Sequence, residues 1–96
     1  MDPELRRLYL QDLKEIDTEI ERFGAHVDLL LEKAEILDFL GRHEESLAVL
    51  RQGLAQEPDN PDLWNNVGVV FKNIARYQEA FDALMKSQRA APNRAV

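Results

Sequence analysis

The stretch that decides the fold lies at residues 61–92, which read PDLWNNVGVVFKNIARYQEAFDALMKSQRAAP. Large and small residues recur there at the spacing of one helix face, i, i+3, i+4 and i+7: Trp64, Val67, Gly68 and Phe71. A glycine inside a helix costs about 1 kcal/mol relative to alanine, so Gly68 indicates the close approach of a second helix. The pattern predicts a helix over residues 61–74 whose apolar face packs against a neighbour.

A second helix is predicted over residues 78–90, because Ala80, Leu84 and Ser87 again share one face. With Tyr77 before this helix and Pro92 after it, the spacing follows the pattern W-x2-L-G-x2-Y, then A-x3-F, then P, of tetratricopeptide repeats. The chain therefore resembles the tetratricopeptide repeat (TPR) family. The resemblance implies an all-α fold in which helical hairpins stack into a solenoid, a right-handed superhelix.

Residues 27–60 look like a degenerate copy of the same unit. Pro58 stands 34 residues before the proline that ends the later unit, and this is the usual length of a TPR unit. The copy departs from the pattern at Lys33, a normally apolar position, and at His43, where an aromatic residue is usual. We interpret His43 as a packed ring. The copy predicts one helix that ends near Gly41 and another that ends before Pro58.

Residues 1–24 are predicted to form a capping helix over 3–22. Asp2 can cap its start, Pro3 suits the first helical position, and Gly24 suits its end. The chain then forms a single TPR-like domain of about five antiparallel helices, divided into residues 1–24, 27–60 and 61–94. Because repeat units are stabilised by their neighbours, we expect further repeats or another chain to cover the C-terminal end.

Composition argues against several classes of protein. The 96 residues include no cysteine, no Gly-rich phosphate loop and no His pair at metal-binding spacing, so the sequence predicts neither an enzyme nor a cofactor or metal site. A net charge of −6 argues against nucleic-acid binding and leaves only a basic tail around Arg89 and Arg94 as a minor candidate. No segment suits a signal peptide or a membrane span, so a cytoplasmic location is the default expectation.

The TPR resemblance implies a non-catalytic protein-interaction module, a scaffold or adaptor, in which the first helix of each unit lines a concave groove. In the first unit the groove positions are Asp28, Leu31, Glu32, Glu35, Asp38 and Phe39. In the second unit they are Asp62, Asn65, Asn66, Val69, Lys72 and Asn73. The first set is acidic and the second is rich in amides, which favours a basic or amphipathic peptide or helix of a partner protein.

A different ligand is bound by one TPR subfamily, which clamps the C-terminal carboxylate of heat-shock chaperones with Lys and Asn. Asn66 falls on one clamp position, but Leu31 and Glu35 stand where Lys and Asn are needed. Glu32 and Glu35 would also repel a carboxylate, so this ligand is disfavoured.

The alternative function is structural: self-association through the C-terminal end, which would give a homo-oligomer. Residues 1–60 hold 15 acidic and 7 basic residues, net −8, whereas residues 61–96 hold 3 and 5, net +2. Such an asymmetry can orient two copies head to tail. The candidates for surface left over after the hairpins have packed are Val70, Ile74, Phe81 and Met85.

Overall fold

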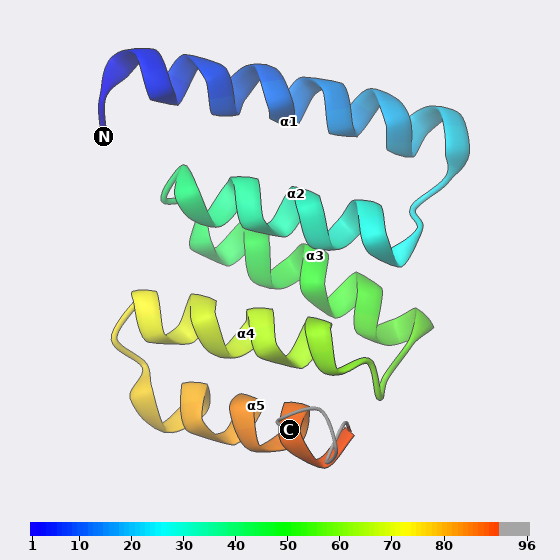
Figure 1. Cartoon of the computed structure of the whole chain (residues 1–96), viewed down its shortest axis with the longest axis vertical. Helices are drawn as coiled ribbons and strands as arrows, with labels where there is room; N and C mark the ends of the chain where they lie inside the picture. Colours follow the sequence, from blue (N-terminus) through cyan, green and yellow to red (C-terminus); the bar gives the residue numbers. More distant parts are fainter. Residues whose placement is uncertain (91–96) are drawn as a thin grey trace.

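The computed structural model describes residues 1–90, and these form five α-helices and no strand (Figure 1). The helices are α1 (Pro3–Phe23), α2 (Val27–Phe39), α3 (His43–Gln56), α4 (Pro61–Asn73) and α5 (Tyr77–Ala90). The predicted all-α fold is confirmed, and each helix lies close to the range predicted from the sequence. The predicted C-terminal features at Pro92 and Arg94 lie outside the described residues.

Two of the helices begin at polar residues that cap them, Asp2 and Asn60. The Asp2 carboxylate accepts the backbone N–H of Glu4 at 2.9 Å. The side-chain oxygen of Asn60 accepts the N–H groups of Asp62 and Leu63 at 2.8 and 3.2 Å. Each bond satisfies a backbone donor that has no partner inside its own helix. The bonds of Asn60 therefore fix the residue at which α4 begins after the end of α3.

The turns inside the two hairpins need a left-handed backbone at one position. Gly41, between α2 and α3, has φ 78°, and Ala75, between α4 and α5, has φ 61°. The two residues stand 34 positions apart, so they occupy the same place in successive units. Glycine adopts this conformation without steric cost, whereas alanine does not. The second hairpin therefore holds a strained residue where the first does not.

The helices stack in sequence order, and the chain reverses direction at each turn (Figure 1). α1 packs on α2, α2 on both α3 and α4, α3 on α4, and α4 on α5. Leucines fill the interior, the most buried being Leu30, Leu37, Leu47, Leu50 and Leu63. One polar side chain lies among them: the Ser46 hydroxyl donates to the Ala34 carbonyl at 2.7 Å, which joins α3 to α2. This stacking places α2 and α4 side by side.

Candidate functional site

A shallow pocket of about 210 Å³ lies between α2 and α4, near their C-terminal ends. Ala34, Ser46 and Val70 line its buried part. It also collects residues that the sequence placed in the groove: Glu35, Asp38, Phe39, Asn66, Val69 and Asn73. The tertiary structure thus brings residues of both units to one surface, with apolar groups inside and polar groups around them.

Asp38 is already occupied within the protein. One of its carboxylate oxygens lies 2.6 Å from Nδ1 of His43, and the other accepts from the Asn73 amide at 2.7 Å. Only 9% of the Asp38 side chain is exposed. Because both oxygens hold neighbouring helices, Asp38 and Asn73 join the two units at the edge of the pocket. Asn65 and Asn66 have no such bond among the described residues, so their amides are open to a partner.

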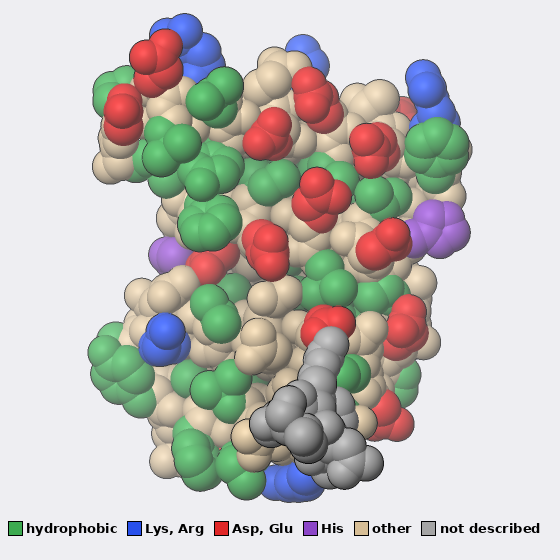
Figure 2. Space-filling model, viewed as in Figure 1, with side chains coloured by type: hydrophobic (Ala, Val, Ile, Leu, Met, Phe, Trp, Pro, Cys, Tyr) green, Lys and Arg blue, Asp and Glu red, His purple; other side chains and the backbone are tan. Residues whose placement is uncertain are grey.

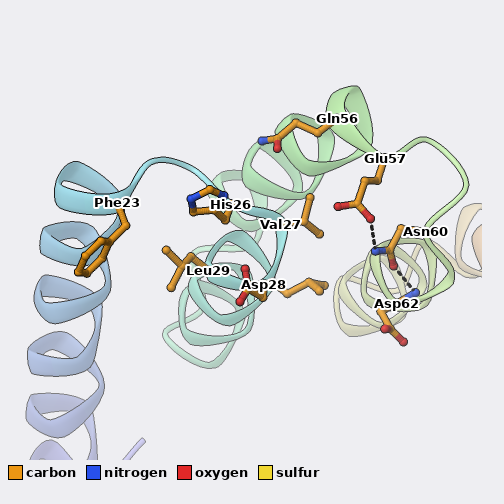
Figure 3. Close-up of a pocket in the computed structure, with 10 residues that line it drawn as sticks. Phe23, His26, Val27, Asp28, Leu29, Gln56, Glu57, Asn60 and Asp62 are labelled. Carbon is orange, nitrogen blue, oxygen red and sulfur yellow. Dashed lines mark hydrogen bonds between the residues drawn. The ribbon is translucent and has the colours of Figure 1, made fainter.

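A second and wider hollow, about 770 Å³, lies at the opposite end of the same two helices (Figure 3). The predicted groove residues Asp28, Leu31 and Asp62 line it. Asn60 stands at its edge and also binds Glu57 at 3.1 Å, and the Gln56 amide donates to the carbonyl of Ala25 at 2.6 Å. These bonds hold the two interhelical connections in place around the hollow. The hollow is therefore bordered by two hydrogen-bonded connections between helices.

The surface between the two pockets is acidic. Asp28, Glu32 and Glu35 are exposed along α2, and Glu32 and Glu35 form no ion pair among the described residues. Figure 2 shows Asp and Glu side chains gathered over both α1 and α2 on the viewed face, with few Lys or Arg among them. Unpaired carboxylates on one face raise the local negative potential, which attracts cationic groups.

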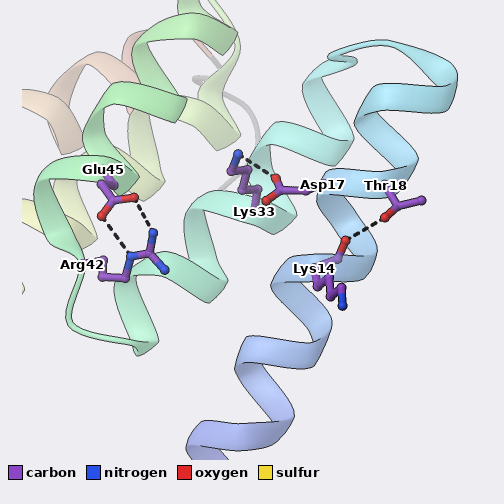
Figure 4. Close-up of polar contacts among 6 residues, drawn as sticks. All are labelled: Lys14, Asp17, Thr18, Lys33, Arg42 and Glu45. Carbon is purple, nitrogen blue, oxygen red and sulfur yellow. Dashed lines mark hydrogen bonds and ion pairs between the residues drawn. The ribbon is translucent and has the colours of Figure 1, made fainter.

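The basic residue nearest in sequence to these acids does not neutralise them. Lys33 reaches α1 instead, where its amino group lies 2.7 Å from Asp17 (Figure 4). This ion pair explains why a lysine is tolerated at a normally apolar repeat position, since its partner lies on the preceding helix. Arg42, just before α3, forms a separate two-bond contact with Glu45 (2.9 and 2.6 Å; Figure 4). Glu32 and Glu35 thus remain without an ion pair among residues 1–90.

The contact of α1 with the edge of the pocket was not predicted from the sequence. Tyr9 stacks on Phe39, with ring centroids 5.3 Å apart and ring planes 19° from parallel. Phe39 stays 56% exposed despite this contact. Tyr9 stands 34 residues before His43, at the same position of the repeat. This spacing is the feature of the sequence from which a repeat-like role of α1 could have been predicted. α1 therefore covers α2 and also contacts Phe39 at the edge of the pocket.

The residues predicted for self-association differ in how far they are exposed. Val70, a candidate for leftover surface, is buried instead: only 2% of it is exposed, because it faces the interior beside Ala34 and Ser46. Ile74 is half-buried against the core, and Met85 is half-buried on α5. Phe81 is exposed. Two exposed neighbours on α5 that the prediction left out are Tyr77 and Leu84.

The hairpins, the 34-residue spacing and the concave surface define a helical repeat protein. Profiles described as "TPR repeat" and "Tetratricopeptide repeat" match residues 40–74 and 61–94 respectively. Together they span more than half of the chain, which belongs to the tetratricopeptide repeat family. Among solved structures, one titled "MamA MSR-1 C2" has the same fold, with a TM-score of 0.79 at 15% sequence identity. The alignment covers 97% of this chain and 52% of that chain, so this chain spans about half of its length.

No curated protein sequence matches the chain. None of the helices in residues 1–90 is both long enough and apolar enough to cross a membrane. Within the same residues, no group of three or more His, Asp or Glu side chains is placed to hold a metal ion. Tetratricopeptide repeats are generally non-catalytic, and the family supports a module that interacts with other proteins.

Proposed function

We propose that the chain is a protein-interaction module that binds a basic amphipathic segment of a partner protein on the concave surface of α1, α2 and α4. The observation that carries this proposal is the exposed Phe39 ring beside a pocket, next to the unpaired carboxylates of Glu32 and Glu35. An apolar anchor surrounded by one sign of charge suits a helix with leucine on one face and lysine at its edges.

The two parts of the surface have different roles in this proposal. Phe39 and Val69 supply the apolar contact, because both line the pocket and neither is fully buried. Asp28, Glu32 and Glu35 supply attraction and orientation, since exposed charges contribute more to the association rate and to specificity than to affinity. Asn65 and Asn66 can bind backbone groups of the partner. A carboxylate ligand is disfavoured by the same acidic side chains.

The test uses a fluorescent helical peptide of about 16 residues, long enough to form a helix, with leucines on one face and lysines beside them. The double substitution Glu32→Lys with Glu35→Lys is expected to weaken binding about tenfold, since each exposed charge contact contributes up to about 1 kcal/mol. Fluorescence anisotropy measures the affinity. Raising the salt concentration should weaken binding to the natural protein more than binding to the variant.

The matched control reverses two exposed charges outside the groove, Glu44→Lys with Asp59→Lys, and gives the same change of net charge. Equal loss of binding in both variants would show that only the overall charge attracts the peptide, and the groove would be rejected. Phe39→Ala is a second variant, expected to weaken binding without a change in salt dependence. Unchanged binding in that variant would remove the apolar anchor from the proposal.

A further inference from the structure

The second helix of each unit carries apolar residues at the same repeat positions, and α1 keeps this register. Leu13 of α1, Leu47 of α3 and Phe81 of α5 stand 34 residues apart. The first two are 8% and 1% exposed, whereas Phe81 is 59% exposed. The next positions of the face show the same contrast: Ile16 and Leu50 are buried and Leu84 is exposed. α2 and α4 pack on α1 and α3, whereas within residues 1–90 α5 contacts α4 alone, which Leu84 meets at Gly68, and no later helix covers Phe81.

The positions of the polar contact at the edge of this face also recur, but with different residues. Between the two units, Asp38 binds His43 and the Asn73 amide of the following helix. Lys72 and Tyr77 stand 34 residues after Asp38 and His43, so they occupy the same two places at the open end. Both are exposed. The acceptor of the inner contact is thus replaced by an exposed cation, which favours a carboxylate in whatever lies opposite.

We propose that this end surface, made of Lys72, Tyr77, Phe81 and Leu84, binds an amphipathic helix of another protein that carries a carboxylate opposite Lys72. The proposal is independent of the groove. α4 shows what such a helix looks like where it covers α3. Leu63 of α4 packs so closely on α3 that a Cβ added to Gly53 would lie 2.8 Å from it. Val70 and Ile74 follow Leu63 on the same face, at i+7 and i+11.

A second copy of the chain related by two-fold symmetry fits this surface less well. A symmetric pair would use the same patch on both copies, so the cationic surface would meet itself. The carboxylates on α5 offer little compensation, since Glu79 pairs with Arg76 at 2.6 Å and Asp82 accepts from Gln78 at 3.2 Å. A partner helix with the aliphatic spacing of α4 and one acidic residue satisfies both the apolar face and Lys72.

The test titrates the isotope-labelled full chain with a synthetic helix of about 16 residues and follows backbone NMR signals. The peptide carries Leu, Val and Ile at the spacing of Leu63, Val70 and Ile74, Ala and Gln elsewhere, and Glu at the place of Asn73. A second peptide has Lys at that place. We expect shifts at Tyr77, Phe81 and Leu84, and about fivefold tighter binding of the Glu peptide.

The charge swap decides whether Lys72 recognises the carboxylate. In Lys72→Glu the preference should reverse, so that the Lys peptide binds tighter. Phe81→Ala should weaken both peptides, whereas Phe23→Ala, an equally exposed aromatic residue on α1, should leave both unchanged. Equal affinity of the two peptides for the natural chain would overturn the proposal. So would a mass that doubles with concentration and shifts the same signals without peptide, because a second copy would then be the occupant.

Discussion

The carboxylate of Asp38 accepts a hydrogen bond from the amide of Asn73 at 2.7 Å, although the two residues stand 35 positions apart. The same carboxylate lies 2.6 Å from the ring of His43. One side chain on α2 therefore holds α3 and α4 at once. In a repeat protein, where each unit is stabilised through its neighbours, such a contact couples the two units.

Removing this carboxylate is expected to destabilise the protein. Asp38→Ala leaves the partly buried His43 ring and the Asn73 amide without their acceptor, which should lower the free energy of unfolding by about 1–3 kcal/mol. Urea denaturation followed by circular dichroism measures the loss. Asn65→Ala is the control, since this exposed asparagine of α4 has no hydrogen bond among the described residues, and its effect should stay within about 0.5 kcal/mol.

A double-mutant cycle tests whether the contact is shared. Asp38→Ala and Asn73→Ala remove the two ends of one bond, so the double variant should lose less stability than the two single variants together, by about 1 kcal/mol. Strict additivity would show that the two side chains do not act through each other.

The backbone strain at Ala75 predicts a stabilising substitution. Alanine at positive φ costs about 1–2 kcal/mol, and glycine does not. Ala75→Gly should therefore raise the free energy of unfolding by about 0.5–1 kcal/mol, after the entropy that glycine adds to the unfolded chain. The reciprocal change is Gly41→Ala, where a Cβ would meet no atom within 4 Å, so only backbone strain can destabilise it. Thermal denaturation of both variants should show shifts of opposite sign.

Close packing at Gly68 predicts a loss of stability when a methyl group is added. A Cβ there would lie 2.8 Å from Cγ of Leu84 and 3.2 Å from the carbonyl oxygen of Ala80. Although Gly68→Ala gains about 1 kcal/mol of helix propensity, the displacement of α5 should destabilise the protein by about 1–3 kcal/mol. In a Leu84→Ala background the cost should be smaller, because the nearer obstacle is gone. An undiminished cost there would assign the strain to the backbone contact alone.

The Arg42–Glu45 pair predicts a small pH dependence. The guanidinium of Arg42 donates two hydrogen bonds to Glu45 and holds the pKa of this carboxyl below its usual value. Since the folded pKa is lowered, the contribution to stability is present above the unfolded pKa, about 4.3, and is lost as the pH falls through the folded pKa. Arg42→Gln should be slightly less stable than the natural protein at pH 7 and equal to it near pH 2. A difference that persists at low pH would point to another role of Arg42.

Much of the fold could be predicted from residues 61–92 because repeat spacing is a local property. Gly68 indicated the close helix contact that the structure shows with Leu84. For the candidate site, the sequence predicted only which residues share one face of a helix. Helical spacing placed Glu35 and Asn66 on one side of their helices, but it could not show that Asp38 and Asn73 bind each other, since this depends on how α4 lies against α2.

The sequence by itself determined the five helices, their caps and the 34-residue register, because hydrophobic spacing, prolines and capping side chains act within a few residues of one another. Only the tertiary structure decided which apolar residues are covered. Val70 and Phe81 look alike as apolar residues of amphipathic helices, yet Val70 lies in the interior and Phe81 on the surface. The reason is geometric: α4 has a helix on either side of it, whereas within residues 1–90 α5 contacts α4 alone.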